Sequence, residues 1–198
     1  LHGDQPVSAE EPIIRIRGVR NQFGDFVVHE NLDLDVRRGE IIGVVGGSGS
    51  GKSVLMRAII GLGNPGPEYE TTRHNAGFLL ADHLARRWSL GPFRRVPAAR
   101  EAAGRAGDQD VRLLKPQTYM NRSGAALASL RSLPGFDPAA DLLVLVDDFA
   151  LPLGRFRLRG AGSAVGHNGL RSIEAELGRQ DYARLRIGIG PLPPGLGD

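Results

Sequence analysis

The spacing of apolar residues changes along the chain. In residues 12–55, the stretches "PIIRIRGV", "FVVHENLDLDV" and "EIIGVVG" are short and strand-like, and the second alternates with a period of two. After residue 55, apolar runs that predict strands are separated by stretches with the period of a helix. The predicted strands there are "RAIIGLG", "DLLVLVDD" and "RLRIGIG", and the predicted helices are "HNAGFLLADHLARRW", "SGAALASLRSL" and "HNGLRSIEAEL".

Strands that alternate with helices predict an α/β fold with a mostly parallel or mixed sheet. A chain of 198 residues has room for one ordinary domain, or for one domain and a fragment. We therefore expect an incomplete β-rich segment in residues 1–55 and an α/β domain in residues 56–198.

The junction between these segments fits two incompatible patterns. Residues 52–60 would be a helix if they continue the upstream segment, whereas residues 56–62 would be a buried strand of the downstream one. An upstream piece of roughly 55 residues has too little core to stand alone, and the larger downstream domain needs this strand. We therefore predict a strand from Ala58 to Gly61, against the helix preference of "KSVLMR".

Composition excludes several classes of protein. No apolar run approaches the ~20 residues that span a bilayer, and the first residues do not form a signal peptide. The chain has no cysteine, which rules out disulfides and thiolate metal sites. We expect a monomer in the cytoplasm that makes no membrane contact by itself.

The net charge of +3 is unevenly distributed, since residues 1–60 carry −1 and residues 61–198 carry +4. The excess is mostly arginine and is densest in "GRFRLRG" and "YARLRIGIG". Such clusters form either a solvated face or a phosphate-binding surface, because guanidinium groups match phosphate oxygens well.

The stretch "GGSGSGKS" fits the G-x-x-x-x-G-K-[ST] phosphate-loop pattern. Its glycines, including Gly46 and Gly51, would let backbone amides surround a phosphate. Lys52 would reach the β- and γ-phosphates, and Ser53 would hold Mg²⁺.

Residues from about 12 to 62 resemble the start of an ABC-transporter ATP-binding subunit, in which Phe23 would stack on adenine. The resemblance also implies a Walker B Asp-Glu, an "LSGGQ"-like signature, a Q-loop and a switch histidine, and none follows Ile60. ATP with Mg²⁺ is therefore expected only under the alternative hypothesis, a nucleotide-binding fragment. A further alternative is an inactive fusion.

Two residues suit ester hydrolysis by activated water. His74 begins a predicted helix, where it would be either a general base or a solvated, helix-capping residue. Asp147 ends the run "LLVLVDD", and the carboxyl ends of strands are where α/β sheets bind ligands, so it could fix the histidine tautomer. Asp148 is expected to be an exposed acid or a turn residue.

Five blocks in one order make the chain from Ile59 onward resemble bacterial peptidyl-tRNA hydrolases. They are "GLGNPGPEYETTRHNAGF", "LLKPQTYMNRSG", "LVLVDDFALPLG", "GHNGLRSI" and "RLRIGIG". The resemblance implies a three-layer αβα fold with a mixed, mostly parallel sheet. It also implies hydrolysis of the ester bond of peptidyl-tRNA without metal or other cofactor.

The same resemblance implies roles for individual residues. His74 would be the general base and Asp147 its orienting partner. Without the family resemblance, Asn64, Asn121 and Asn168 would each be interpreted as a turn former or N-cap, and Met120 as a core residue. Under the resemblance, Asn64 and Asn121 would hold the peptide, and Met120 would line the peptide groove. Asn168, with His167 beside it, would position the water and the terminal adenosine. Tyr69 would lie against the tRNA 3′ end, and Arg159 and Arg186 would clamp the 5′-phosphate.

Three features depart from the family pattern. Val165 stands where the family generally has glycine, which predicts a strained backbone beside Asn168. Ala150 replaces an acid that is common in the family. The family continues for about a quarter of its length beyond "GIGPLPPGLGD", so we expect a truncated domain.

Overall fold

The computed structural model describes residues 14–23, 26–36, 57–107, 109–131 and 133–191, the first two ranges by their backbone only. The chain divides into two compact units, residues 1–53 and residues 54–198. The predicted phosphate-binding residues Gly46, Gly51, Lys52 and Ser53 lie outside the described residues, as does the side chain of Phe23.

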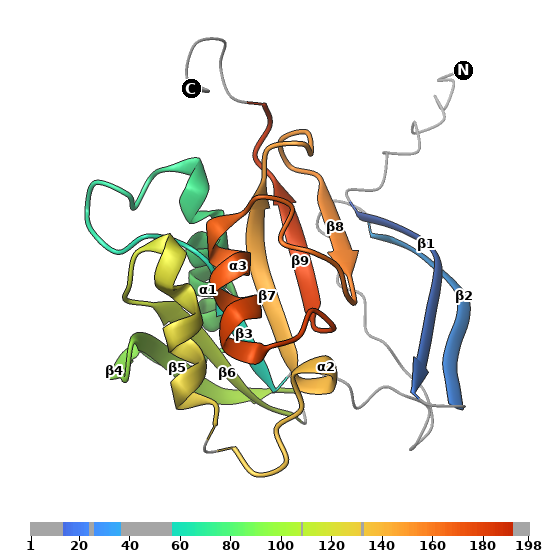
Figure 1. Ribbon diagram of the computed structural model, residues 1–198, viewed down its shortest axis with the longest axis horizontal. Coiled ribbons are helices and arrows are strands. Elements are labelled where there is room, and N and C mark those ends of the chain that lie inside the picture. Colours follow the sequence, from blue (N-terminus) through green and yellow to red (C-terminus); the bar gives the residue numbers. More distant parts are fainter. Residues whose placement is uncertain (1–13, 24–25, 37–56, 108, 132, 192–198) are drawn as a thin grey trace, which may run out of the picture. The chain divides into compact units, whose positions relative to one another are not determined.

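The first unit contains two long strands, β1 (Ile14–Phe23) and β2 (Phe26–Val36), which pair antiparallel (Figure 1). The predicted strands "PIIRIRGV" and "FVVHENLDLDV" are thus confirmed. Because a two-stranded ribbon occurs in many folds, it does not test the resemblance to an ABC-transporter subunit.

The second unit is built on a seven-stranded sheet with the strand order β4-β5-β6-β3-β7-β9-β8. Polar loops at one edge of its central strands carry the candidate site. The strands are β3 (Ala58–Gly61), β4 (Arg94–Val96), β5 (Ala99–Ala106), β6 (Gln109–Pro116), β7 (Leu142–Asp148), β8 (Phe156–Arg159) and β9 (Ala183–Gly188).

The prediction of a mixed sheet is confirmed, but the description "mostly parallel" holds only for its centre. Strands β6, β3, β7 and β9 pair parallel. Strands β4 and β5 extend one side as an antiparallel meander, and β8 pairs antiparallel with β9 on the other. Half of the pairings are therefore antiparallel. Short connections join β4 to β5 and β5 to β6, whereas the segment between β8 and β9 contains helix α3.

The junction forms the predicted strand. Strand β3 spans Ala58–Gly61, all four residues are buried, and it pairs on both sides with parallel strands. Its alternating side chains enter both cores of the unit, with Ile60 on one face and Ile59 on the other. This central position explains why tertiary packing decides its conformation.

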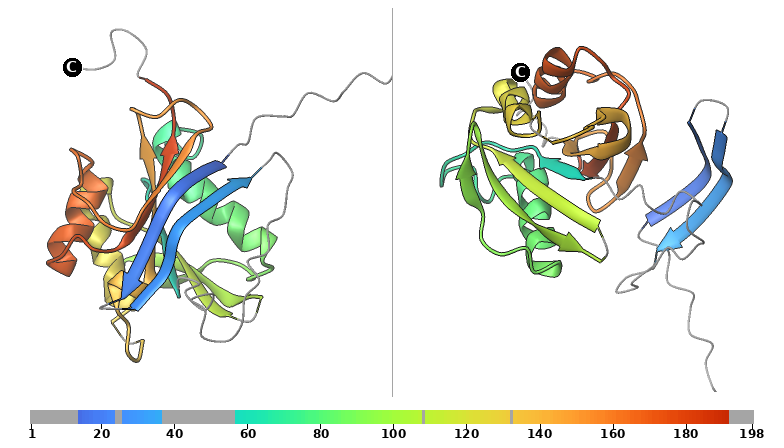
Figure 2. Two further views of the ribbon diagram at one scale, coloured as in Figure 1. Left: turned by 90° about the vertical axis from the view of Figure 1, so that its right-hand side faces the viewer. Right: turned by 90° about the horizontal axis from the view of Figure 1, so that it is seen from below.

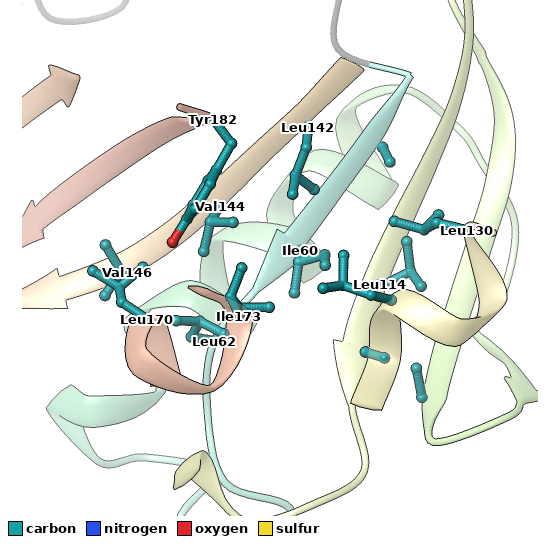
Figure 3. Close-up of a cluster of buried hydrophobic side chains, with 14 of the residues drawn as sticks. Ile60, Leu62, Leu114, Leu130, Leu142, Val144, Val146, Leu170, Ile173 and Tyr182 are labelled. Carbon is teal, nitrogen blue, oxygen red and sulfur yellow. The ribbon is translucent and has the colours of Figure 1, made fainter. Parts of the chain in front are cut away.

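Helices cover both faces of the sheet and complete three layers (Figure 2). Helix α1 packs on the Ile59 face, and η2 and α3 pack on the Ile60 face, where the larger apolar cluster lies (Figure 3). The helices are η1 (Arg73–Asn75), α1 (Ala76–Arg87), η2 (Met120–Ser129), α2 (Pro138–Asp141) and α3 (Asn168–Leu177).

Two predicted helices, α1 and α3, are confirmed, while "SGAALASLRSL" forms most of the 3₁₀ segment η2, which is interrupted at Arg122. Gly124 explains how closely η2 approaches α3. A Cβ atom at this position would lie 2.2 Å from the carbonyl oxygen of Ser172. Within the described part of the chain, no helix is long and apolar enough to cross a membrane.

Candidate active site

The candidate site lies at the carboxyl ends of the parallel strands β6, β3 and β7. The loop after β3 carries Asn64 and leads to His74 in η1, and β7 ends at Asp147 and Asp148. Parallel strands bring these residues, which are distant in sequence, to one edge of the sheet.

His74 and Asp147 form the predicted pair. The Nδ1 atom of His74 lies 2.9 Å from Oδ2 of Asp147. The Asp147 side chain is completely buried, whereas half of the His74 side chain is exposed. The edge of the imidazole also contacts the ring of Phe149, with 4.8 Å between ring centroids. A buried carboxylate thus holds a histidine that faces solvent.

Asp147 also binds a second histidine. Its Oδ1 atom lies 3.0 Å from Nε2 of His167, which caps the amino end of α3. The other ring nitrogen of His167, Nδ1, accepts hydrogen bonds from the backbone N–H groups of Gly169 and Leu170. Because Nδ1 accepts, a neutral His167 carries its proton on Nε2 and donates it to Asp147.

The hydrogen-bond network assigns the tautomer of His74 as well. An ionised carboxylate only accepts hydrogen bonds, so Nδ1 of His74 must donate to Asp147. In the neutral ring, the unprotonated nitrogen is then Nε2. Since His74 is half exposed, this arrangement can offer a lone pair to a water molecule.

Asn64 is held by a residue that the sequence did not single out. The side chain of Asn75, only 2% exposed, accepts a hydrogen bond from the Asn64 N–H group and donates one to its carbonyl oxygen. The side-chain oxygen of Asn64 accepts from the backbone N–H of Met120. Its Nδ2 amide has no partner among the described residues and can donate to a ligand.

Four further candidate residues, Met120, Asn121, Asn168 and Tyr69, make fewer contacts. Met120 is partly buried against the apolar core, and a Cβ atom at Gly169 would lie 2.7 Å from its sulfur, so the Met120 side chain would have to shift. Asn121 and Asn168 are exposed, and Tyr69 is half-buried. The N-cap of α3 is His167, so the alternative N-cap hypothesis for Asn168 is wrong.

A hollow of about 640 Å³ opens beside Asp147 and His167 and gathers arginines from β8 and β9. We call it the arginine hollow. It contains the predicted pair Arg159 and Arg186, and also Arg157 and Arg184, which the sequence analysis did not select. Arg184 is buried and pairs with Glu174, and Arg186 pairs with Asp148. Arg157 and Arg159 are exposed, and their positive charge suits a phosphate group.

The expectation that Asp148 is an exposed acid is wrong. Asp148 is buried, its Oδ1 accepts from the Ala150 N–H, and its Oδ2 accepts from Arg186 at 3.1 Å. Arg186 also donates to the carbonyl oxygen of Ser163. Asp148 is the last residue of strand β7, and its side chain binds the N–H group of Ala150 in the turn that follows and orients Arg186 in the arginine hollow.

The predicted backbone strain at Val165 is present. Its φ angle is 47°, a left-handed conformation that is unfavourable for a β-branched residue. Its side chain is 73% exposed in the wall of the arginine hollow.

Some site residues could have been found from local signals. Asn75 directly follows His74 and precedes an apolar helix, a position that often carries a functional or capping side chain. No local sequence signal indicated the contact between Asp147 and His167, because Asp147 ends strand β7 and His167 lies 20 residues further along, in the loop before α3. Among the described residues, no group of three or more histidines and acids is arranged to hold a metal.

The chain is similar in sequence to proteins of one family. The sequence profile of a family described as peptidyl-tRNA hydrolase matches residues 58–197. A Gemmatimonas aurantiaca peptidyl-tRNA hydrolase is 53% identical over 137 residues, which cover 69% of this chain and 72% of that protein. A Synechococcus peptidyl-tRNA hydrolase is 48% identical over 146 residues, which cover 70% of this chain and 62% of that protein.

The chain is also similar to a solved structure of the same family. The crystal structure of peptidyl-tRNA hydrolase from Acinetobacter baumannii superposes with a TM-score of 0.65 at 38% identity, over 71% of this chain and 71% of that one. The chain spans about two thirds of the length of these relatives.

Proposed function

Because the chain belongs to the peptidyl-tRNA hydrolase family, we propose that it hydrolyses the ester bond of peptidyl-tRNA with His74 as the general base. The observation that carries this proposal is the hydrogen bonding of Asp147. One oxygen accepts from His167, whose tautomer is fixed by backbone amides, and the other accepts from His74. This leaves Nε2 of His74 unprotonated.

In the proposed reaction, Nε2 of His74 removes a proton from water as the water oxygen attacks the ester carbonyl. Asp147 stabilises the resulting imidazolium. The tetrahedral intermediate then expels the 3′-oxygen of the terminal adenosine, and His74 returns the proton to that oxygen. The products are a peptide with a free carboxyl group, which loses its proton to solvent, and a tRNA with a free 3′-hydroxyl.

Neutral amides and arginines supply binding in this proposal. The free Nδ2 of Asn64 donates to the acyl part of the substrate, aided by Asn121, while Met120 lines the groove. Asn168 orients the water and the terminal adenosine, and Tyr69 lies against the tRNA 3′ end.

The arginine hollow takes phosphate. Arg159 and Arg186 there bind the 5′-phosphate of the tRNA, so affinity should fall as salt rises. We further propose that the protein acts as a monomer in the cytoplasm without a cofactor.

The test is hydrolysis of N-acetyl-aminoacyl-tRNA by the purified chain and by His74→Ala. Loss of the base should lower kcat by roughly a thousandfold. His83→Ala is the matched control, since His83 is exposed on helix α1 outside the site. A His74→Ala protein that is folded and as fast as the control would overturn the proposal.

The phosphate-loop motif remains a separate prediction. If residues 46–53 bind nucleotide, ATP affinity should disappear in Lys52→Ala, and equilibrium binding measured with and without Mg²⁺ would decide this. Hydrolysis of peptidyl-tRNA should be unaffected by the same substitution.

A further inference from the structure

A second hollow lies on the other side of the site. Its volume is about 650 Å³, and it begins at Asn64 and at Asn75, the neighbour of His74. We call it the Arg100 hollow. The loop after β3, helix α1 and strands β5 and β6 enclose it, with the side chains of Phe78, Leu79, Asp82, Arg100, Lys115 and Gln117 among its walls.

The charges of the two hollows differ. In the arginine hollow, the exposed Arg157 and Arg159 have no acidic partner among the described residues, whereas the Arg100 hollow has two cations, Arg100 and Lys115, and an equal number of acids, Glu70 and Asp82. A phosphate backbone favours the first composition. The second mixes amides, apolar side chains and isolated charges, which is the composition of sites that bind peptides and small molecules.

The positions of the two hollows suggest that each binds a different part of the substrate. Asp147 and His167 line the arginine hollow, and Asn64 and Asn75 line the Arg100 hollow. An ester next to His74 therefore has one hollow on each side. If the RNA lies toward the arginines, the acyl chain points toward the Arg100 hollow.

One charge in this hollow is uncompensated. The cross-strand register places Arg95 opposite Arg100 and Arg100 opposite Lys115, so three cations lie side by side on the α1 face of β4, β5 and β6. Cations directly opposite each other repel. Lys115 is neutralised by Asp82 at 2.6 Å and lies 4.4 Å from the ring centroid of Phe93.

Arg100, by contrast, is exposed and has no ion-pair or hydrogen-bond partner for its side chain within the ranges the structure describes. The only acid besides Asp82 in the wall, Glu70, belongs to the loop after β3, whereas Arg100 lies on β5, two strands along the sheet. A carboxylate from a ligand would relieve the repulsion between Arg100 and its neighbours.

We propose that the peptide of peptidyl-tRNA continues from Asn64 into the Arg100 hollow and that Arg100 favours substrates with an acidic side chain near the ester. This inference rests on the proposed function. It makes Arg100 a specificity-determining residue, which contacts the peptide but takes no part in proton transfer.

The experiment uses peptidyl-tRNAs that share one tRNA and one esterified residue. They carry glutamate, glutamine or lysine at the second or third residue from the ester. The intact chain should show a kcat/KM ratio of roughly fivefold for glutamate over lysine, the size of one exposed ion pair. Arg100→Glu should reverse the order.

Arg105→Glu is the matched control. Arg105 lies on the same strand, but the alternation of side chains places it on the opposite face from Arg100, and the charge change is identical. This control should keep the preference of the unmodified chain. Equal glutamate-to-lysine ratios in the unmodified chain and in Arg100→Glu, at both positions, would overturn the inference.

A binding measurement separates this inference from the proposed function. Fluorescently labelled tetrapeptides with a free carboxyl end, containing glutamate or lysine, are titrated with each protein, and anisotropy gives the affinity. A preference for glutamate that reverses in Arg100→Glu supports peptide binding in the Arg100 hollow even if no ester is hydrolysed. Hydrolysis without any such preference leaves the proposed function intact and removes the role of Arg100.

Discussion

Strands β3 and β7 are neighbours, and polar side chains gather at both of their ends, but the two ends use their hydrogen bonds differently. At the amino end, Arg57 precedes β3 and Asp141 precedes β7, and they form a two-pronged ion pair with distances of 2.9 and 2.6 Å. The other donors of Arg57 bind the carbonyl oxygens of Pro134 and Gly135. These polar groups satisfy one another.

At the carboxyl end of the same strands, the groups are oriented but not all satisfied. Asp147 binds two histidines, and Asn75 fixes the backbone of Asn64. Nε2 of His74 and Nδ2 of Asn64 remain available within the described structure. One pair of strands therefore has polar groups that bind one another at its amino end and polar groups that are free to bind a ligand at its carboxyl end.

Among substitutions at the carboxyl end of these strands, Asp147→Asn should lower activity the most. His167 needs an acceptor opposite its Nε2–H, so the amide oxygen must face His167 and the amide NH₂ must face His74. His74 would then accept at Nδ1 and carry its proton on Nε2, which removes the base. We expect kcat to fall by about a hundredfold or more.

Histidine ¹⁵N chemical shifts provide the check that distinguishes this mechanism from loss of structure. They should report a changed tautomer of His74 in a folded Asp147→Asn protein. Unchanged tautomers together with normal turnover would refute the assignment.

Asn75→Ala tests the two hydrogen bonds by which the Asn75 side chain holds the backbone of Asn64. The substitution leaves the buried N–H and C=O groups of Asn64 without partners, which should lower the free energy of unfolding by about 1–3 kcal/mol. Because Asn64 is then less firmly held, KM should also rise. Urea denaturation and steady-state kinetics measure the two effects, and Asn75→Asp should restore only the bond to the Asn64 N–H group.

Arg159→Ala should affect binding without affecting stability. Arg159 is exposed in the arginine hollow, unlike Arg186, which holds the buried Asp148. We expect KM for the tRNA substrate to rise about fivefold to tenfold and its salt dependence to weaken by about one phosphate contact. Arg87→Ala, a change of the same charge at the end of α1, serves as the control.

Asp141→Asn should have the smallest effect and should spare activity. Burial acts to raise the pKa of Asp141, but hydrogen bonds from Arg57 and from the Asp137 backbone, with the charge of Arg57, hold it below its usual value. A lowered pKa in the folded protein means that the ion pair stabilises the fold above the unfolded pKa of about 4 and loses this effect as the pH falls through the folded value.

The substitution should therefore cost less than about 1 kcal/mol at neutral pH, since Arg57 is partly exposed, and nothing at strongly acidic pH. Thermal unfolding of both proteins across the acidic range measures this convergence. A constant difference at every pH would show that the ion pair is not its source.

Much of the centre of the fold could be predicted from local patterns. The apolar runs of β3, β7 and β9 and the helical periods of α1 and α3 were sufficient to identify these elements. Strands β4, β5, β6 and β8 were missed. Strand β5, "AREAAGRA", buries only alanines, so its pattern lacks the large apolar residues that mark a strand.

The sequence by itself determined which residues are candidates for the chemistry, because His74 and Asp147 lie in recognisable motifs at the ends of predicted elements. Only the tertiary structure decided which side chains these candidates contact. The second histidine on Asp147, the support of Asn64 by Asn75 and the repulsion between Arg95, Arg100 and Lys115 all depend on strand register and on contacts between distant segments. A local pattern specifies neither, since hydrophobic periodicity fixes which face a residue takes but not which residue lies opposite.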